Sequence, residues 1–388
     1  MWYLSQLGRR EHYALPSFLH EHGKLGLLAT DVWCGLAGRV PAGWLPRKLA
    51  QRYNPRLKKA KVVSQGLWSA AWNSLSMQPQ SLRWVNDGRG FGSFAAAEFA
   101  KTILGAGDVV LGYTAANLEQ LKLAKARGAR GLHVQVDTGL EWYQTRQAEQ
   151  QAYPEVEDEA EMPDGSFFDR VRAEWAEAEQ VIVHSEHSKR ALVHQGVAED
   201  RCFVAPPSFE PIPGGRVRER KRGQPLRVLF VGYHCLTKGY HYFVQAAKTA
   251  PAGMEFHSAG RSMLKEAYQA EAAKHVRMHG HLPQASVFKL MVDSDILVFP
   301  TLSDGFGLVQ LEAMSLGLPV ISTQQCGDVV REGIDGFRIQ ARDAQGINAS
   351  LSALMDGPDR LSSMSHAAMR RAEAFDASAF FVRLNNNL

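Results

Sequence analysis

Two carboxylates lie eight residues apart within residues 300–322, at Asp304 and Glu312. Glu312 stands at helical spacing from Leu308 and Leu316, which places it at the edge of an apolar helix face. Burying a carboxylate there is costly unless donors reach it, and a pair of ligand hydroxyls would supply them. The alternative is that Glu312 reaches water. Asp304, just before the helix, is either an N-cap or an acceptor for a hydroxylated ligand.

The residues between these carboxylates favour a close approach to a ligand. Gly305 and Gly307 remove side chains from the turn, so the backbone can approach another molecule. The N–H groups of Phe306 and Leu308 lie where a helix begins and have no partner within it. Lys238, in the turn after another apolar strand, would add a cation for an anionic ligand. Its alternative role is a solvated lysine.

The surrounding pattern predicts how these residues are held. Short apolar runs alternate with helical segments on both sides of a Pro- and Gly-rich stretch, which is typical of parallel sheets covered on both faces. We therefore expect an α/β fold with two Rossmann-like domains facing a central cleft, where strand carboxyl ends bind ligands. The expected units are domains at 1–207 and 226–370, a linker at 208–225 and a tail at 371–388 that packs back on the first domain.

Two local predictions accompany this organisation. The apolar spacing of residues 115–127 predicts one continuous helix after the strand at 108–114. The last segment, 365–388, has a helical pattern and ends in the polar sequence NNNL, which we expect to fray.

The motif around Asp304 resembles that of a known family. The chain has DGFG at 304–307, Glu312 eight residues after Asp304, and GLPVI at 317–321. This is similar to the signature of family 4 (group 1) retaining glycosyltransferases of the GT-B fold, in which E-G-F-G precedes a second Glu and G-x-P-V-I follows. Asp304 stands where the family usually has Glu. Tyr233 stands where the family commonly has Arg.

The resemblance implies a hexosyltransferase-type enzyme. It would move a sugar from a nucleotide-sugar to an acceptor hydroxyl with retention, using no metal and no other cofactor. By similarity Glu312 would hold the ribose and Lys238 the diphosphate. Asp304 would accept from donor-sugar hydroxyls beside the backbone of Gly305 and residues 306–308. The first choice of donor is a UDP-sugar, although the base and the sugar cannot be read from the sequence.

The first domain offers two candidates for a place near the reacting sugar. Asp137 ends the segment GLHVQVD, in which His133, Gln135 and Asp137 share one strand face. The resemblance implies a His or Asp from this domain, so Asp137 or His133 is expected to be catalytic. The alternative is a polar strand face satisfied by neighbouring loops.

Three further positions are expected near the donor. Gly8 would let the first strand's turn approach the diphosphate, or it is an ordinary turn glycine. Gly280 would lie near the base. Arg261 would compensate for the cation that Tyr233 lacks. Asp293 and Asp295 form a D-x-D sequence, which we interpret as structural rather than as a metal site.

The bulk composition restricts the setting. The net charge is +4, and no nucleic-acid motif accompanies the local positive charge. Four cysteines without a CxxC pair suit a reducing cytoplasm, and no signal peptide or membrane span is evident. Residues 39–61 combine basic side chains with Trp44, which would suit an anionic inner membrane surface, or form a solvated face. The acceptor is expected to be a surface glycan or a glycolipid.

Two alternatives to transfer remain open at this point. Another GT-B activity, such as a glycosyl phosphorylase, would use phosphate in place of the acceptor hydroxyl. The departures at Asp304 and Tyr233 also allow a catalytically weak subunit that binds a nucleotide-sugar.

Overall fold

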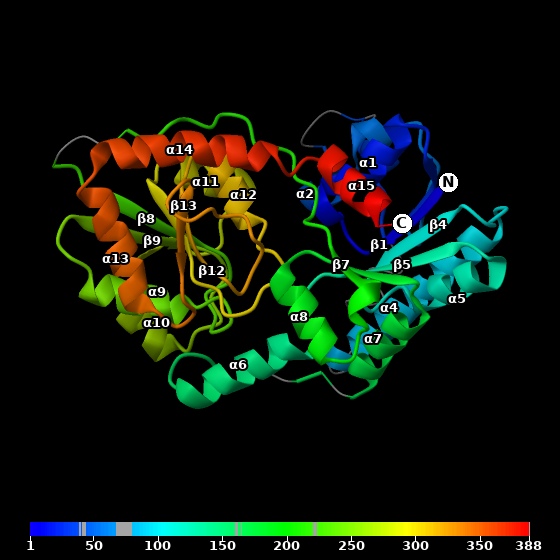
Figure 1. Cartoon of the computed structure of the whole chain (residues 1–388), viewed down its shortest axis with the longest axis horizontal. Helices are drawn as coiled ribbons and strands as arrows, with labels where there is room; N and C mark the ends of the chain where they lie inside the picture. The colour runs from blue at the N-terminus through cyan, green and yellow to red at the C-terminus, as the bar shows by residue number, and fades with distance from the viewer. Residues whose placement is uncertain are drawn as a thin grey trace.

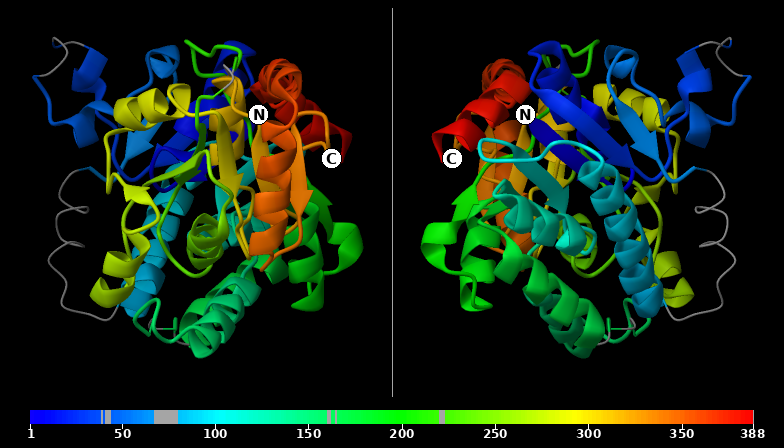
Figure 2. Two further views of the ribbon diagram at one scale, coloured as in Figure 1. Left: turned by 90° about the vertical axis from the view of Figure 1, so that its left-hand side faces the viewer. Right: turned by 90° about the vertical axis from the view of Figure 1, so that its right-hand side faces the viewer.

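The computed structural model describes residues 1–38, 40, 44–66, 80–159, 162–163, 165–219 and 223–387. Two α/β domains lie side by side, with the first half of the chain in one and the second half mainly in the other (Figure 1). Side views show helices on the faces of the sheets (Figure 2).

The N-terminal domain contains a seven-stranded sheet in the described part of the chain, and its strands are all paired in parallel. The order β3-β2-β1-β4-β5-β6-β7 reverses direction between β1 and β4. Such a reversal is where doubly wound sheets bind ligands. The strands, in sheet order, are β3 (Val62–Ser64), β2 (Leu25–Thr30), β1 (Trp2–Gln6), β4 (Val109–Tyr113), β5 (Arg130–Gln135), β6 (Gln180–Val183) and β7 (Cys202–Val204).

The C-terminal domain repeats this plan over its described residues. Its six strands pair in parallel in the order β10-β9-β8-β11-β12-β13, so the reversal lies between β8 and β11. The strands are β10 (Arg277–Met278), β9 (Met254–Ala259), β8 (Leu226–Val231), β11 (Ile296–Phe299), β12 (Val320–Thr323) and β13 (Gly336–Ile339).

Helices connect the strands. In the first domain they are α1 (Ala14–Glu21), α2 (Arg47–Ala50), α4 (Gln80–Ala100), α5 (Leu118–Arg127), α6 (Leu140–Ala152), α7 (Gly165–Glu177) and α8 (Glu186–His194). After the linker they are α9 (Tyr240–Thr249), α10 (Glu266–Ala272), α11 (Gln284–Val292), α12 (Val309–Ser315), α13 (Ala344–Met355), α14 (Pro358–Glu373) and α15 (Ala377–Asn386).

Alternating side chains of each central strand enter cores on opposite faces of the sheet, as the pleat requires. In β1, Leu4 packs into one core and Tyr3 into another. In β8, Val228 and Leu229 divide in the same way. Both faces of these strands are therefore buried, which explains their continuous apolar sequence.

The last helix returns to the N-terminal domain. Phe380 and Phe381 of α15 join the core beside Trp2, and the Phe381 ring meets the Trp2 ring edge-on with centroids 5.7 Å apart. Figure 1 shows α14 along one side of the C-terminal domain and α15 beside α1. The chain therefore crosses between the domains a second time.

Helix α6 extends in the opposite direction, from the N-terminal domain toward α9 and α10 (Figure 1). Its buried Glu149 carboxylate contacts three groups of the C-terminal domain. Oε2 lies 3.1 Å from His241 Nε2 and accepts from the Tyr242 hydroxyl at 3.1 Å, and Oε1 accepts from Arg342 Nε at 2.6 Å. The end of α6 is thus fixed to the domain that it does not belong to.

One of the two local predictions was wrong. The helix expected over 115–127 begins at Leu118, because Ala115 adopts a left-handed conformation (φ 67°) and its N–H donates to Glu174 at 2.7 Å. The helical pattern expected over 365–388 is present in α14 and α15, and α15 continues to Asn386, two residues into NNNL, with Leu384 buried beside the two phenylalanines; Leu388 lies outside the described residues.

Candidate active site

A cavity of about 320 Å³ lies between the domains at the two sheet reversals. It is lined by residues that follow β1, β5 and β6 on one side and β8 and β11 on the other. Because these strand ends meet at one place, residues distant in the sequence face one space. We call this space the cleft cavity, and its polar lining residues are Arg10, Glu11, His184, Tyr233, Lys238 and Asp304.

An ion pair between Lys238 and Asp304 lies in the cleft cavity. Lys238 comes from the β8–α9 turn and Asp304 from the β11–α12 turn. Burial tends to lower the pKa of Lys238, but the neighbouring Asp304 carboxylate outweighs it, and the pKa is raised. Lys238 is therefore a cation at neutral pH. The other carboxylate oxygen, Asp304 Oδ1, accepts from the N–H of Phe306 at 3.3 Å.

The two glycines after Asp304 have packing roles that the sequence did not reveal. A Cβ on Gly305 would lie 1.9 Å from the carbonyl oxygen of Val136, at the end of β5. Gly307 has φ 80°, and a Cβ there would lie 2.4 Å from the Phe299 ring. Gly305 is thus small because the two domains touch at this turn, whereas Phe306, Gly307 and Leu308 line the cleft cavity.

Glu312 faces a neighbouring cavity of about 340 Å³ that shares Glu11 and Leu308 with the cleft cavity. The described residues provide no hydrogen bond or ion pair to its side chain, and burial raises the pKa of its carboxyl group. The carboxylate therefore lies at a cavity wall without the partner that its position requires.

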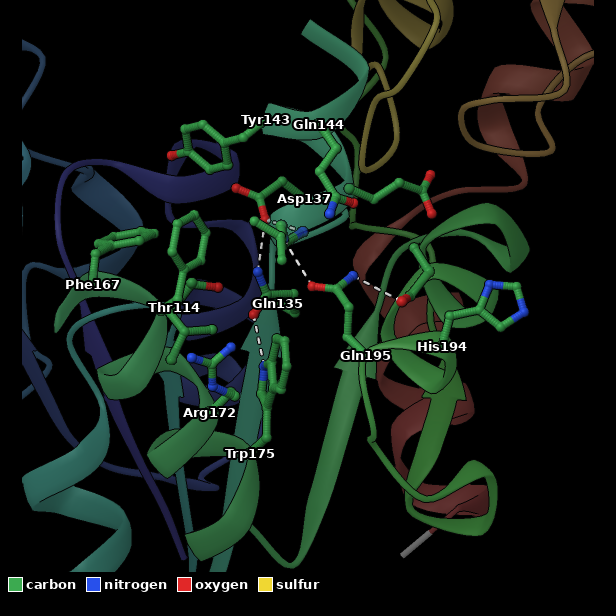
Figure 3. Close-up of a pocket in the computed structure, with 16 residues that line it drawn as sticks. Thr114, Gln135, Asp137, Tyr143, Gln144, Phe167, Arg172, Trp175, His194 and Gln195 are labelled. Atoms are coloured by element: carbon green, nitrogen blue, oxygen red, sulfur yellow. Dashed lines mark hydrogen bonds between the residues drawn. The ribbon is translucent and has the colours of Figure 1, made fainter. Parts of the chain in front are cut away.

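Asp137 lies on the side of the Val136 backbone that faces away from the cleft cavity. Val136 lines the cleft cavity, whereas Asp137 lines a cavity of about 400 Å³ within the N-terminal domain (Figure 3). Asp137 Oδ1 accepts from the Gln135 side chain at 2.7 Å and from the N–H of Gly139 at 2.9 Å. Burial nevertheless raises the pKa of Asp137. The carboxyl group is held in one orientation close to the Asp304 turn.

His133 does not fit the catalytic role expected for it. Its side chain is fully buried, lies 3.3 Å from Gln135 Oε1, and lines none of the cavities described here. Burial lowers its pKa to about 4, so the ring is neutral. The physical reason is its depth: His133 shares a strand face with Asp137 but lies two residues inside the carboxyl end of β5, whereas Asp137 lies two residues beyond it.

Arg10 is a site residue that sequence reasoning missed. It lines the cleft cavity, and its guanidinium carbon lies 5.4 Å above the centre of the Tyr113 ring. Arg10 Nε is buried and has no hydrogen-bond partner among the described residues. The only sequence signal was its position two residues after Gly8, in the turn that follows β1.

The backbone after Arg10 is strained. Glu11, His12 and Tyr13 have φ of 41°, 54° and 66°, in the left-handed region that non-glycine residues rarely adopt. Each such residue costs on the order of 1–3 kcal/mol, and surrounding contacts must hold it. The Tyr113 hydroxyl donates to Glu11 at 3.1 Å, and the Tyr13 ring packs edge-on against Trp33. Strain of this kind is concentrated at functional sites.

The remaining predicted residues lie around this centre. Gly8 has φ 79° and donates to Asp31 at 3.0 Å, and it lines none of the described cavities. Arg261 and Tyr233 line a cavity of about 330 Å³ at the ends of β8 and β9. The carbonyl of Gly280 accepts from Gly260 at 2.8 Å, directly before His281, which lines that cavity.

Two arginines of the basic segment 39–61 form ion pairs within the protein. Arg52 pairs with Asp31 at 2.9 Å, and Arg56 pairs with Glu21 at 2.6 Å. Trp44 is 77% exposed, while Arg39 and residues 41–43 lie outside the described residues. In the described part of the chain, no helix is long and apolar enough to span a membrane.

Metal-binding side chains are not gathered in the described residues: no three His, Cys, Asp or Glu side chains lie where they could hold an ion together. Asp295, from the D-x-D sequence, accepts from the N–H of Arg227 at 2.8 Å, which is the structural role expected for it.

Residues 225–357 match the family model described as "Glycosyl transferases group 1". The C-terminal domain belongs to the group 1 glycosyl transferases. This match contains Lys238, Asp304 and Glu312, and it confirms the family predicted from their spacing.

Relatives of this glycosyl transferase domain match over only part of their length. The D-inositol 3-phosphate glycosyltransferase of Thermobispora bispora is 36% identical over 111 residues, which are 28% of this chain and 26% of that protein. The glycogen synthase of Mycobacterium tuberculosis is 31% identical over 166 residues, covering 40% of this chain and 38% of the synthase. The chain thus matches about a quarter to two fifths of the length of these curated relatives.

The fold is shared over the whole chain. Anabaena Alr3699/HepE, solved in complex with UDP, superimposes with a TM-score of 0.65 at 14% identity, covering 100% of this chain and 99% of that one. The predicted GT-B fold is therefore confirmed.

Proposed function

We propose that this glycosyl transferase is an enzyme that transfers a sugar from a nucleoside diphosphate sugar to an acceptor hydroxyl. The proposal rests chiefly on one arrangement: two cations, Lys238 and Arg10, face one cavity from opposite domains, beside the Asp304 carboxylate. The family of the C-terminal domain supports the same reaction.

The cations match the charge that the reaction develops. When the anomeric bond breaks, its electron pair passes to the terminal phosphate oxygen of the leaving diphosphate. Fixed cations stabilise that charge without reorganising. Lys238 is protonated because of its ion pair, and Arg10 retains a free donor in Nε among the described residues. Arg10 would thereby replace the cation that the family commonly places at Tyr233. This set of cations supports transfer without a metal ion.

The carboxylates would orient the sugars. Asp304 would accept from donor-sugar hydroxyls, and Asp137, held by Gly139 and Gln135, would lie on the acceptor side of the transferred sugar. Glu312 would accept from the ribose hydroxyls, which would supply the partner it lacks. In a retaining transfer the acceptor oxygen bonds to the anomeric carbon on the face that the diphosphate leaves, and its proton passes to the departing phosphate oxygen. The family resemblance supports retention.

The donor is proposed to be a UDP-sugar. UDP is the nucleotide in the complex of the similar Anabaena protein, and the cavity of about 330 Å³ at the ends of β8 and β9 would receive the base. We also propose that the protein acts close to the inner face of the cytoplasmic membrane, because Trp44 is exposed.

Nucleotide binding tests this proposal directly. The purified chain is heated with UDP, GDP or ADP in turn. We expect one of them to stabilise it by about 2.7 kcal/mol at a hundredfold excess over its dissociation constant. Lys238→Ala should abolish the shift, whereas Lys289→Ala, which removes an exposed lysine of the same domain, should retain it. No shift with any of the three would contradict the proposal. Release of sugar 1-phosphate in the presence of phosphate would identify a phosphorylase instead.

A further inference from the structure

A second, larger groove opens from the cleft cavity. Its volume is about 630 Å³, roughly twice that of the cleft cavity. Tyr233 and Lys238 line both spaces, so the groove begins where the proposed reaction occurs. At its other side, Tyr143 also lines the N-terminal cavity of Figure 3, where its ring lies near Phe167. A molecule in this groove would therefore have one end at the reacting centre.

Aromatic rings form the N-terminal side of this groove. Trp84 comes from α4, and Trp142 and Tyr143 are neighbours in α6 with ring centroids 5.0 Å apart. Trp84 is 39% exposed despite its size. Large aromatic surfaces left open beside a cleft indicate a binding surface. Sugar rings present a face of C–H groups that stacks on such rings, while their hydroxyls remain available to polar neighbours.

The charges that line the groove leave no excess of positive charge for an anionic occupant. Arg146 pairs with Glu157, and Lys238 pairs with Asp304. Arg261 is the one groove cation for which the described residues provide no side-chain partner. Asp158 and Glu159 add two carboxylates to the wall, and Asp158 Oδ1 lies 3.9 Å from Lys265 Nζ. A phosphorylated acceptor would therefore find one cation without a side-chain partner, Arg261, together with two wall carboxylates, whereas an uncharged chain of sugars would meet stacking surfaces and hydrogen-bonding groups.

We infer that this aromatic groove binds the acceptor, and that the acceptor is an uncharged oligosaccharide. The inference rests on the proposed function for the reaction itself, and it adds the class of acceptor and the surface that recognises it. The sugar that receives the transfer lies beside Tyr233 and Lys238, and the following sugars stack on Trp142 and Trp84. Such an acceptor differs from D-inositol 3-phosphate, the phosphorylated compound in the name of the Thermobispora relative.

Calorimetric binding to the full-length chain tests the groove. The probes are maltotetraose, mannotetraose and tetra-N-acetylchitotetraose, with myo-inositol 3-phosphate as the anionic comparison. We expect at least one tetrasaccharide to bind more tightly than the inositol phosphate. Trp142→Ala should weaken that binding about tenfold, the usual loss when a central aromatic contact is removed. Trp142→Phe should recover part of it. Trp44→Ala, which removes an exposed tryptophan outside the groove, should leave it unchanged.

The outcomes separate this inference from the proposed function. If no tetrasaccharide binds, or if Trp142→Ala and Trp84→Ala both bind like the unaltered chain, the groove does not hold the acceptor. Tighter binding of myo-inositol 3-phosphate than of all three glycans would also overturn the inference. Absence of nucleotide binding would instead contradict the proposed function, and the tetrasaccharide result would still decide the groove.

Discussion

Gly305 provides a sharp test of how the domains meet. A Cβ at this position would lie 1.9 Å from the Val136 carbonyl oxygen, and ordinary contact begins near 3.4 Å, so the turn and β5 must separate by about 1.5 Å in Gly305→Ala. Both contacting groups are backbone, so no side chain can rotate away. Because the backbone of Gly305 has a negative φ, the clash is the main consequence of the substitution.

We expect Gly305→Ala to lose more in turnover than in nucleotide affinity. A displacement of about 1 Å at a reacting centre costs on the order of a hundredfold in rate. Lys238 and Glu312 belong to the C-terminal domain and would keep their places, whereas Arg10 would move away with the N-terminal domain, so the dissociation constant of the nucleotide should rise by a smaller factor than turnover falls. Stability should fall by about 1–3 kcal/mol, as for other overpacked sites.

The assay compares the turnover number with the nucleotide dissociation constant of the same preparation. Gly90→Ala is the control, because Gly90 lies in α4 with no atom within 4 Å of an added Cβ. It should leave turnover unchanged and stabilise the helix by up to about 1 kcal/mol. Unaltered turnover in Gly305→Ala would show that the domains do not touch at this turn during the reaction.

Four further substitutions test individual side chains. Glu312→Gln should raise the melting temperature near neutral pH and weaken nucleotide binding. Burial raises the pKa of Glu312, so the stabilisation should disappear as the pH falls below about 4.5, and a gain that persists in acid would contradict this reasoning. Arg10→Ala should weaken nucleotide binding and Tyr233→Arg should restore it in that variant, whereas unchanged affinity in Arg10→Ala would exclude the role of Arg10. The pKa of Glu149 is lowered, because contacts with His241 and Arg342 outweigh its burial, so its contribution to stability is present above about pH 4.5 and is lost below. The melting temperature of Glu149→Gln should therefore vary less with acid pH than that of the unaltered chain. Equal variation of the two melting temperatures would refute the role of these contacts.

Much of the architecture was predictable because its signals are local. Continuous apolar runs predicted most of the strands, and the spacing around Glu312 predicted a helix that the structure places at 309–315. The start of α5 was misplaced because its cause is distant: Glu174, almost sixty residues along the chain, holds the left-handed turn at Ala115.

The candidate site was predictable where one turn supplies its residues. The DGFG turn and Glu312 carry their own pattern, so their proximity to a ligand could be proposed from sequence. Arg10 carried no such pattern, because its relation to Lys238 depends on two sheets meeting. Gly305 was assigned to ligand approach for the same reason, since Val136 is invisible in its local sequence.

Two contacts that tie the domains together, those of α15 and of Glu149, limit how this protein can move. Helix α15 ties the C-terminal half to β1 and α1, and Glu149 of α6 ties the N-terminal half to α9 on the other side of the molecule (Figure 1). The two domains therefore cannot move apart without breaking at least one of these two contacts. A third contact, the 2.7 Å hydrogen bond between the hydroxyls of Thr138 and Ser303, lies between the domains, so a rotation about the line through both ties would disturb it. Since α6 begins three residues after Asp137, such a rotation would also move the Asp137 carboxylate. Motion of the domains would therefore change the alignment of the reacting groups.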